Sequence, residues 1–76
     1  MNWIKLSERE PPLGKRVILR KMVANVWMSF RGELYESIKY GRIMWNVVGF
    51  DNLQEKDSFT YWAEIVPPES EAKSDN

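Results

Sequence analysis

The chain contains no cysteine and no histidine among its 76 residues. It therefore has no disulfide, which would be unusual for a secreted domain of this size. Zinc sites built from Cys and His, thiolate nucleophiles and histidine-based triads are excluded. No apolar run approaches the roughly 20 residues of a membrane-spanning helix, and the first residues lack the apolar stretch of a signal peptide. We expect a soluble, cytoplasmic protein without a metal or cofactor.

Sequence patterns for other chemistry are scarce as well. The four glycines are isolated from one another and match no phosphate-binding loop. The polar loop 51–57 lacks the ligand and glycine spacing of an EF-hand. Two pairs of carboxylates could do acid–base chemistry, but nothing in the sequence places either pair in a pocket; these are Glu8 with Glu10 and Glu33 with Glu36. We therefore expect that the protein is not an enzyme, and a carboxylate hydrolase is the least favoured hypothesis.

The formal net charge of zero conceals an uneven distribution. Residues 1–50 hold nine basic and four acidic residues, a balance of +5, and residues 51–76 hold two basic and seven acidic residues, a balance of −5. Such asymmetry can mark a basic binding face beside an acidic tail, or the two halves can neutralise each other in the fold. Without an overall positive charge, sustained binding to nucleic acid is not expected.

Alternation of polar and apolar residues predicts a mainly β fold, a small single antiparallel sheet of about four strands. The expected strands are 16–23, 24–31, 42–50 and 58–66, preceded by an extended start at 3–6 and a proline-rich turn. Residues 33–40 are ambiguous. They suit a short helix ended by Gly41, which gives an α+β alternative, or an irregular or hairpin segment, which we favour.

The sequence predicts one small β-rich domain, residues 1–66, and a disordered acidic tail, residues 67–76. The strand expected at 42–50 is apolar on both faces, which is typical of a strand that is covered on two sides or lies at an interface. Because so small a monomer has little material to cover both sides, we expect a homo-oligomer.

Four tryptophans in so short a chain indicate either an aromatic core or a binding surface. A period of two places Trp27 on one strand face with Asn25, Ser29 and Arg31, and Trp62 with Thr60 and Glu64. Rings flanked by polar groups and arginine can stack on a base or anchor a protein. The alternative is burial, with Trp3 covering Trp62 in a second small core. The predicted binding residues are Trp27, Arg20, Arg31, Asn25, Ser29 and Trp62.

Two blocks of sequence resemble a known family. Residues 3–19, with Trp-Ile, Ser-Glu-Arg, a proline pair, a glycine and a Val-Ile-Leu strand, are similar to the opening of the domain of unknown function numbered 551. Residues 59–62 followed by the proline pair at 67–68 are similar to its closing segment, although Tyr61 stands where that family has histidine. The resemblance covers the two ends of the chain and implies a small phage or prophage protein with no assigned activity.

Two hypotheses follow for the function. The first is a non-enzymatic, phage-type accessory protein that acts by binding, countering a host protein such as a defence component. The second is an oligomer that sequesters a nucleotide-like ligand, in which aromatic rings clamp the base and Arg20, Arg31 or Arg42 meets the phosphate. The first implies an unidentified host protein as the partner, and neither implies a membrane.

Overall fold

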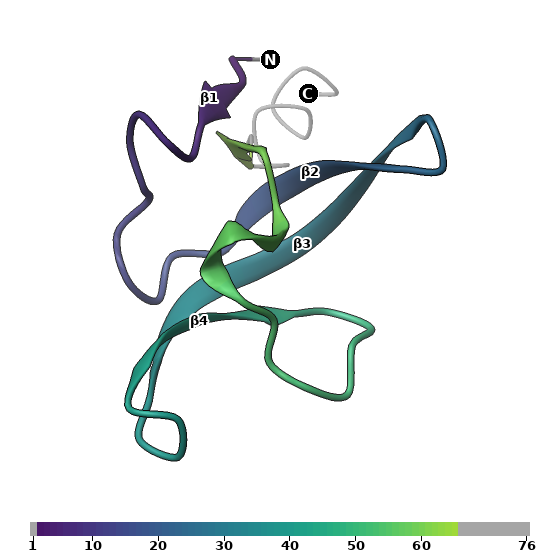
Figure 1. Ribbon diagram of the computed structural model, residues 1–76. Coiled ribbons are helices and arrows are strands. Elements are labelled where there is room, and N and C mark those ends of the chain that lie inside the picture. Colours follow the sequence, from purple (N-terminus) through teal and green to yellow (C-terminus); the bar gives the residue numbers. More distant parts are fainter. Residues whose placement is uncertain (1, 66–76) are drawn as a thin grey trace, which may run out of the picture.

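The computed structural model describes residues 2–65, so the predicted tail at 67–76 lies outside the described residues. All described strands join one antiparallel sheet in the order β1-β5-β2-β3-β4 (Figure 1). The predicted mainly β fold is confirmed, with a fifth strand added by the short N-terminal segment. The strands are β1 (Ile4–Lys5), β2 (Val17–Val23), β3 (Val26–Ser37), β4 (Arg42–Val47) and β5 (Tyr61–Glu64), and a single 3-10 turn, η1 (Lys56–Ser58), precedes β5.

The hairpin of β2 and β3 is the longest element of the fold. Its connection has two residues, Ala24 and Asn25, with φ of 51° and 66°. Two-residue turns with both central residues at positive φ match the twist of the flanking strands. The strand predicted to begin at residue 24 therefore begins two residues later, and it extends to Ser37 rather than ending at Arg31.

The alternative of a helix at 33–40 is wrong, and the hairpin, one of the two forms that we favoured, is confirmed. Residues up to Ser37 complete β3, where Leu34 pairs with Trp45 and Ser37 pairs with Arg42. The turn is closed by the amide of Gly41, which donates to the Ser37 carbonyl at 2.8 Å, and Gly41 has a φ of 68°. Cross-strand packing against the aromatic β4 outweighs the modest helix preference of this segment.

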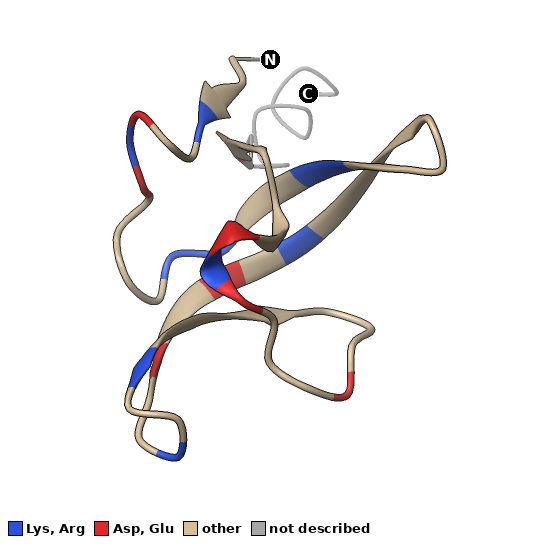
Figure 2. Ribbon diagram, viewed as in Figure 1, with Lys and Arg blue, Asp and Glu red and all other residues tan. Residues whose placement is uncertain are grey.

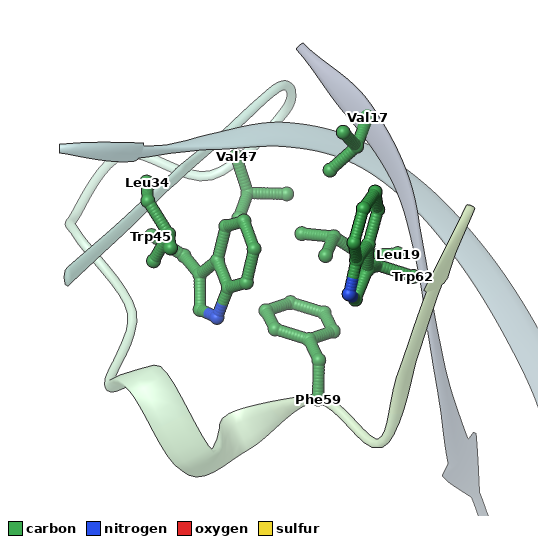
Figure 3. Close-up of a cluster of buried hydrophobic side chains, with 7 residues drawn as sticks. All are labelled: Val17, Leu19, Leu34, Trp45, Val47, Phe59 and Trp62. Carbon is green, nitrogen blue, oxygen red and sulfur yellow. The ribbon is translucent and has the colours of Figure 1, made fainter. Parts of the chain in front are cut away.

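The sheet has two faces, which we call the core face and the outer face. The core face carries seven buried side chains that pack together (Figure 3): Val17, Leu19, Leu34, Trp45, Val47, Phe59 and Trp62. The connection from β4 to β5 crosses this face and brings Phe59 against Trp45, with ring centroids 6.1 Å apart. The Trp45 indole donates to the carbonyl of Lys56 at 3.0 Å, which fastens the connection to the sheet.

The apolar segment at 42–50 is largely covered within the single chain. Trp45 and Val47 are buried on the core face and Met44 is buried on the other side of β4. Of its large hydrophobic residues, Val48 is the exposed one, at 58%. Burial of this segment therefore does not require a subunit interface.

Candidate functional site

Four of the six predicted binding residues lie on the outer face. Arg20 pairs with Ser29 across β2 and β3, Met22 pairs with Trp27, and Ile18 pairs with Arg31. Val17 and Leu19 alternate with these positions and are buried on the core face. Because side chains alternate along a strand, Arg20, Trp27, Ser29 and Arg31 share the opposite side of the sheet.

The prediction that Trp62 lies in the binding site is wrong. Trp62 is 2% exposed and belongs to the main core, where it pairs with Leu19. Its indole donates to the carbonyl of Arg9 at 2.7 Å, which ties the N-terminal segment to β5. The alternative of a second small core under Trp3 is also wrong, because Trp3 packs on the side chain of Arg20 instead.

Asn25 does not join the predicted site either. It occupies the second turn position of the β2–β3 hairpin with φ of 66°, so its period-two relation to Trp27 does not apply. Asparagine tolerates this left-handed conformation better than most residues. Its local role is therefore explained by the turn.

The outer face carries a stacked group that we call the Trp–Arg cluster, composed of Trp3, Arg20, Trp27 and Tyr61. The Arg20 guanidinium carbon lies 5.1 Å from the ring centroid of Trp3 and 5.0 Å from that of Trp27. Trp27 contacts Tyr61 with centroids 5.5 Å apart and planes tilted by 59°. These distances lie within the range of cation–π and aromatic pair interactions. The cluster is thus one continuous surface built around a single arginine.

Strand register explains why these four side chains meet. Arg20 lies directly opposite Tyr61 on β5 and directly opposite Ser29 on β3. Trp27 faces Met22, which places it diagonally from Arg20, a separation that long and aromatic side chains can bridge. Ser29 contributes only a short side chain at the position opposite Arg20. β1 pairs with β5 and brings the adjacent Trp3 to the same region.

The cluster remains accessible and carries uncompensated positive charge. Trp27 is 40% exposed, and Trp3, Arg20 and Tyr61 are half-buried. Arg20 and Arg31 take part in none of the ion pairs formed among residues 2–65. Figure 2 shows basic segments on both β2 and β3. An anionic group on a partner could therefore reach this face without first displacing a described carboxylate.

Three other basic residues, in β2 or just before it, are engaged elsewhere. Lys15 pairs with Glu64 at 3.3 Å and Arg16 pairs with Glu33 at 3.2 Å. Lys21 lies over the ring of Phe59, 5.2 Å from its centroid. The four basic residues at 15–21 therefore do not form one phosphate-binding patch.

A separate groove of about 830 Å³ lies between the N-terminal segment, η1 and the start of β4. Leu6, Ile43 and Phe59 supply its apolar lining. Its rim holds two ion pairs, Arg42 with Glu55 and Lys56 with Glu10, the latter at 2.8 Å.

The charges in this groove compensate one another. The hydrogen bond from Arg42 lowers the pKa of the exposed Glu55 carboxyl and raises the pKa of Arg42. Arg42 is thus paired in the groove, although the nucleotide hypothesis offered it as a phosphate ligand. Within residues 2–65, no group of three or more acidic side chains is arranged to hold a metal ion.

Trp3 and Tyr61 are the cluster residues that sequence reasoning missed. Period-two alternation across the strand expected at 58–66 places Tyr61 with Phe59 and Ala63, on the face opposite Trp62. The strand starts only at Tyr61, and Phe59 belongs to the preceding connection, so its direction is independent of that period. The position of Trp3 in the cluster could not be predicted from local spacing, because it depends on the long-range pairing of β1 with β5.

Comparisons with family models, with curated proteins and with solved structures find no match. The resemblance to the domain of unknown function numbered 551 thus stays a prediction. Across residues 2–65 no helix has the length and apolar character needed to cross a membrane.

Proposed function

We propose that this chain is a non-enzymatic protein that acts by binding another protein through the Trp–Arg cluster. The observation that carries the proposal is the stacking of Arg20 between Trp3 and Trp27, at 5.1 and 5.0 Å, on a face where Trp27 stays 40% exposed. Tryptophan, tyrosine and arginine are the residues that most often dominate binding energy at protein interfaces. Here all three types meet in one cluster.

The stacking also reduces what association would cost in entropy. A free arginine or tryptophan side chain loses about 0.5–1.5 kcal/mol when an interface immobilises it. Arg20 is already held between two rings and Trp27 is already held by Tyr61. A partner would therefore meet a surface whose large side chains are ordered before it arrives, and which offers the guanidinium to a carboxylate.

The resemblance at the two ends of the chain supports a phage-type accessory role, in which the partner is a host protein, such as a defence component, in the host cytoplasm.

The experiment compares tagged wild-type chain with Trp27→Ala and Arg20→Ala in capture from bacterial lysate, read by mass spectrometry. Tyr40→Ala is the matched control, because Tyr40 is 43% exposed and also lies beside cationic groups, in the turn between β3 and β4.

A specific partner should be retained by the wild-type and Tyr40→Ala chains. It should be lost from the other two, with at least about thirtyfold weaker affinity, as expected for hot-spot residues. Capture that is equal for all four chains, or no specific capture by the wild type, would refute the proposed function.

A nucleotide-like ligand is the second candidate, and the absence of a described carboxylate beside Arg20 and Arg31 favours it. Both arginines share the outer face with Trp27, so a base and a phosphate could be met from one side. Thermal unfolding with ATP, GTP and AMP tests this candidate. A ligand at a hundred times its Kd should stabilise the fold by about 2.7 kcal/mol, and the shift should vanish in Arg31→Ala. Unchanged melting with all three nucleotides rejects it.

A further inference from the structure

Each side of β3 can pair with a neighbouring strand, and on the side where β4 lies, part of β3 has no neighbour among residues 2–65. On this side of β3, β4 pairs only with Gly32–Ser37, and the amide of Val48 donates to the carbonyl of Arg31 at 2.8 Å. Residues 26–30 are paired on their other side alone, with β2. The result is a free edge of five residues between the hairpin turn and the end of β4, which we call the β3 edge.

The sequence of the β3 edge lacks the residues by which proteins usually block strand pairing; at its end nearer Val48, the ring of Phe50 packs against Phe30, with centroids 5.3 Å apart. The edge sequence is Val-Trp-Met-Ser-Phe, without a charge or a proline, whereas natural edges are commonly protected by lysine, proline, bulges or a covering segment. Val26 is 59% exposed and Met28 is 43% exposed. An uncharged, apolar and unpaired edge is a template for another strand.

The backbone groups of the β3 edge are oriented for such pairing. The Arg31 carbonyl points away from β2, because it accepts from Val48. Hydrogen-bonding direction alternates along an antiparallel strand, so Ser29 and Trp27 present their N–H and C=O groups to the same side. Val26, Met28 and Phe30 use theirs toward β2. The edge therefore offers two residues with complete donor and acceptor sets.

We propose that the β3 edge pairs with the β3 edge of a second copy of this chain, antiparallel and centred on Met28. Val48 limits the edge at one end and the Ala24–Asn25 turn limits it at the other, so the five free residues have Met28 as their midpoint. A two-fold axis through that midpoint is the arrangement in which both edges are fully used.

Self-complementarity is the reason to choose a second copy as the occupant. In this register Trp27 lies opposite Ser29 of the second copy, a large side chain against a small one, on the outer face. Val26 lies opposite Phe30 of the second copy and Met28 lies opposite itself, on the other face. Trp27 and Ser29 exchange backbone hydrogen bonds across the axis, which gives four in all. No charge is brought against a like charge.

Pairing of this kind has a consequence for the Trp–Arg cluster. A two-fold axis perpendicular to the sheet keeps the outer faces of both copies on the same side. The dimer would thus carry two clusters on one continuous sheet, suited to a partner with two equivalent sites. The dimer itself does not depend on the proposed function and is tested without any partner.

The first test is the mass of the purified protein over a wide concentration series, by light scattering coupled to size exclusion. The apparent mass should rise from 9.0 kDa toward twice that value.

The register is tested with Met28→Cys, which introduces the sole cysteine of the chain. Opposed residues at a non-hydrogen-bonded position have Cα atoms about 4.5 Å apart, within the disulfide range of about 4.4–6.8 Å. Met28→Cys should cross-link under mild oxidation, and Ile38→Cys, at a site 93% exposed on the β3–β4 turn, should not.

Ser29→Pro tests the hydrogen bonds. It removes an N–H that β2 does not use, so the monomer should keep its sheet, with Ser29→Thr as the control. Losing one hydrogen bond from each copy should raise the dimer Kd about tenfold or more. Should Ser29→Pro fail to fold, Met28→Lys and Met28→Glu decide the matter, since each should be monomeric alone and an equal mixture should form a heterodimer. A constant 9.0 kDa mass, equal cross-linking at 28 and 38, or dimers that survive these variants would overturn the proposal.

Discussion

Trp62→Phe separates a core role for this indole from a binding role. The substitution keeps an aromatic ring in the position opposite Leu19 but removes the N–H that donates to the Arg9 carbonyl at 2.7 Å. It also leaves a void, because phenylalanine is smaller and the site is 2% exposed. Both effects act on the folded state, so stability should fall while the outer face is unchanged.

The magnitude follows from the two losses. A hydrogen bond of this kind contributes about 0.5–1.5 kcal/mol, and the residual void costs on the order of 1–2 kcal/mol. Together they predict a loss of about 2–3 kcal/mol. For a domain of this size, each kcal/mol shifts the melting temperature by about 4–8 °C, so Trp62→Phe should melt about 10–20 °C lower.

The matched comparison is Trp27→Phe, at a site 40% exposed with no hydrogen bond from its indole among residues 2–65. Its cation–π contact with Arg20 is worth about 0.5–1 kcal/mol at an exposed site, so its melting temperature should fall only a few degrees. Far-UV circular dichroism at one fixed protein concentration measures both variants. Equal melting of Trp62→Phe and the wild type, or a Trp27→Phe loss as large as that of Trp62→Phe, would refute this assignment of the two indoles.

Three further predictions concern the sheet and its charges. Gly32→Ala should destabilise the fold by about 1–3 kcal/mol, measured by urea denaturation, because the new Cβ would lie 2.8 Å from the Asn46 carbonyl oxygen. Ala24→Gly should stabilise the hairpin by up to about 1 kcal/mol in the same assay, because Ala24 has φ of 51°, where glycine is unstrained. The Arg42 hydrogen bond lowers the pKa of Glu55. The small stabilisation from the Arg42–Glu55 pair is therefore present at neutral pH and is lost as pH falls through the folded-state pKa of Glu55. Glu55→Gln should lower the melting temperature slightly at neutral pH and leave it unchanged in acid.

The strands were predictable because period-two alternation is local. Val17 and Leu19 alternate with Ile18 and Arg20, and the structure buries the first pair on one face. The two-residue turn at Ala24 was less visible, since alanine is not a typical residue for positive φ. The fifth strand, β1, has only two residues, too few for a periodic signal.

The site was predictable in part, for a related reason. Trp27, Ser29 and Arg31 lie on one strand, so their shared face follows from spacing alone. The face of Trp62 could not be settled in this way, because apolar residues occur at both parities between 58 and 66. Its burial depends on the register with Leu19 and on the Arg9 carbonyl, contacts between residues far apart in the chain.

The four indoles divide by how their N–H groups are satisfied. Trp45 and Trp62 are buried and donate to the chain's own carbonyls, as a buried indole requires. Trp3 and Trp27 flank Arg20, and within residues 2–65 neither donates to a protein acceptor. Since residues 2–65 offer these two N–H groups no acceptor, they can donate to a carbonyl or carboxylate on a partner. Since the core is complete without Trp27, substitutions there should change binding far more than folding, and this separation makes the proposed function testable by mutation.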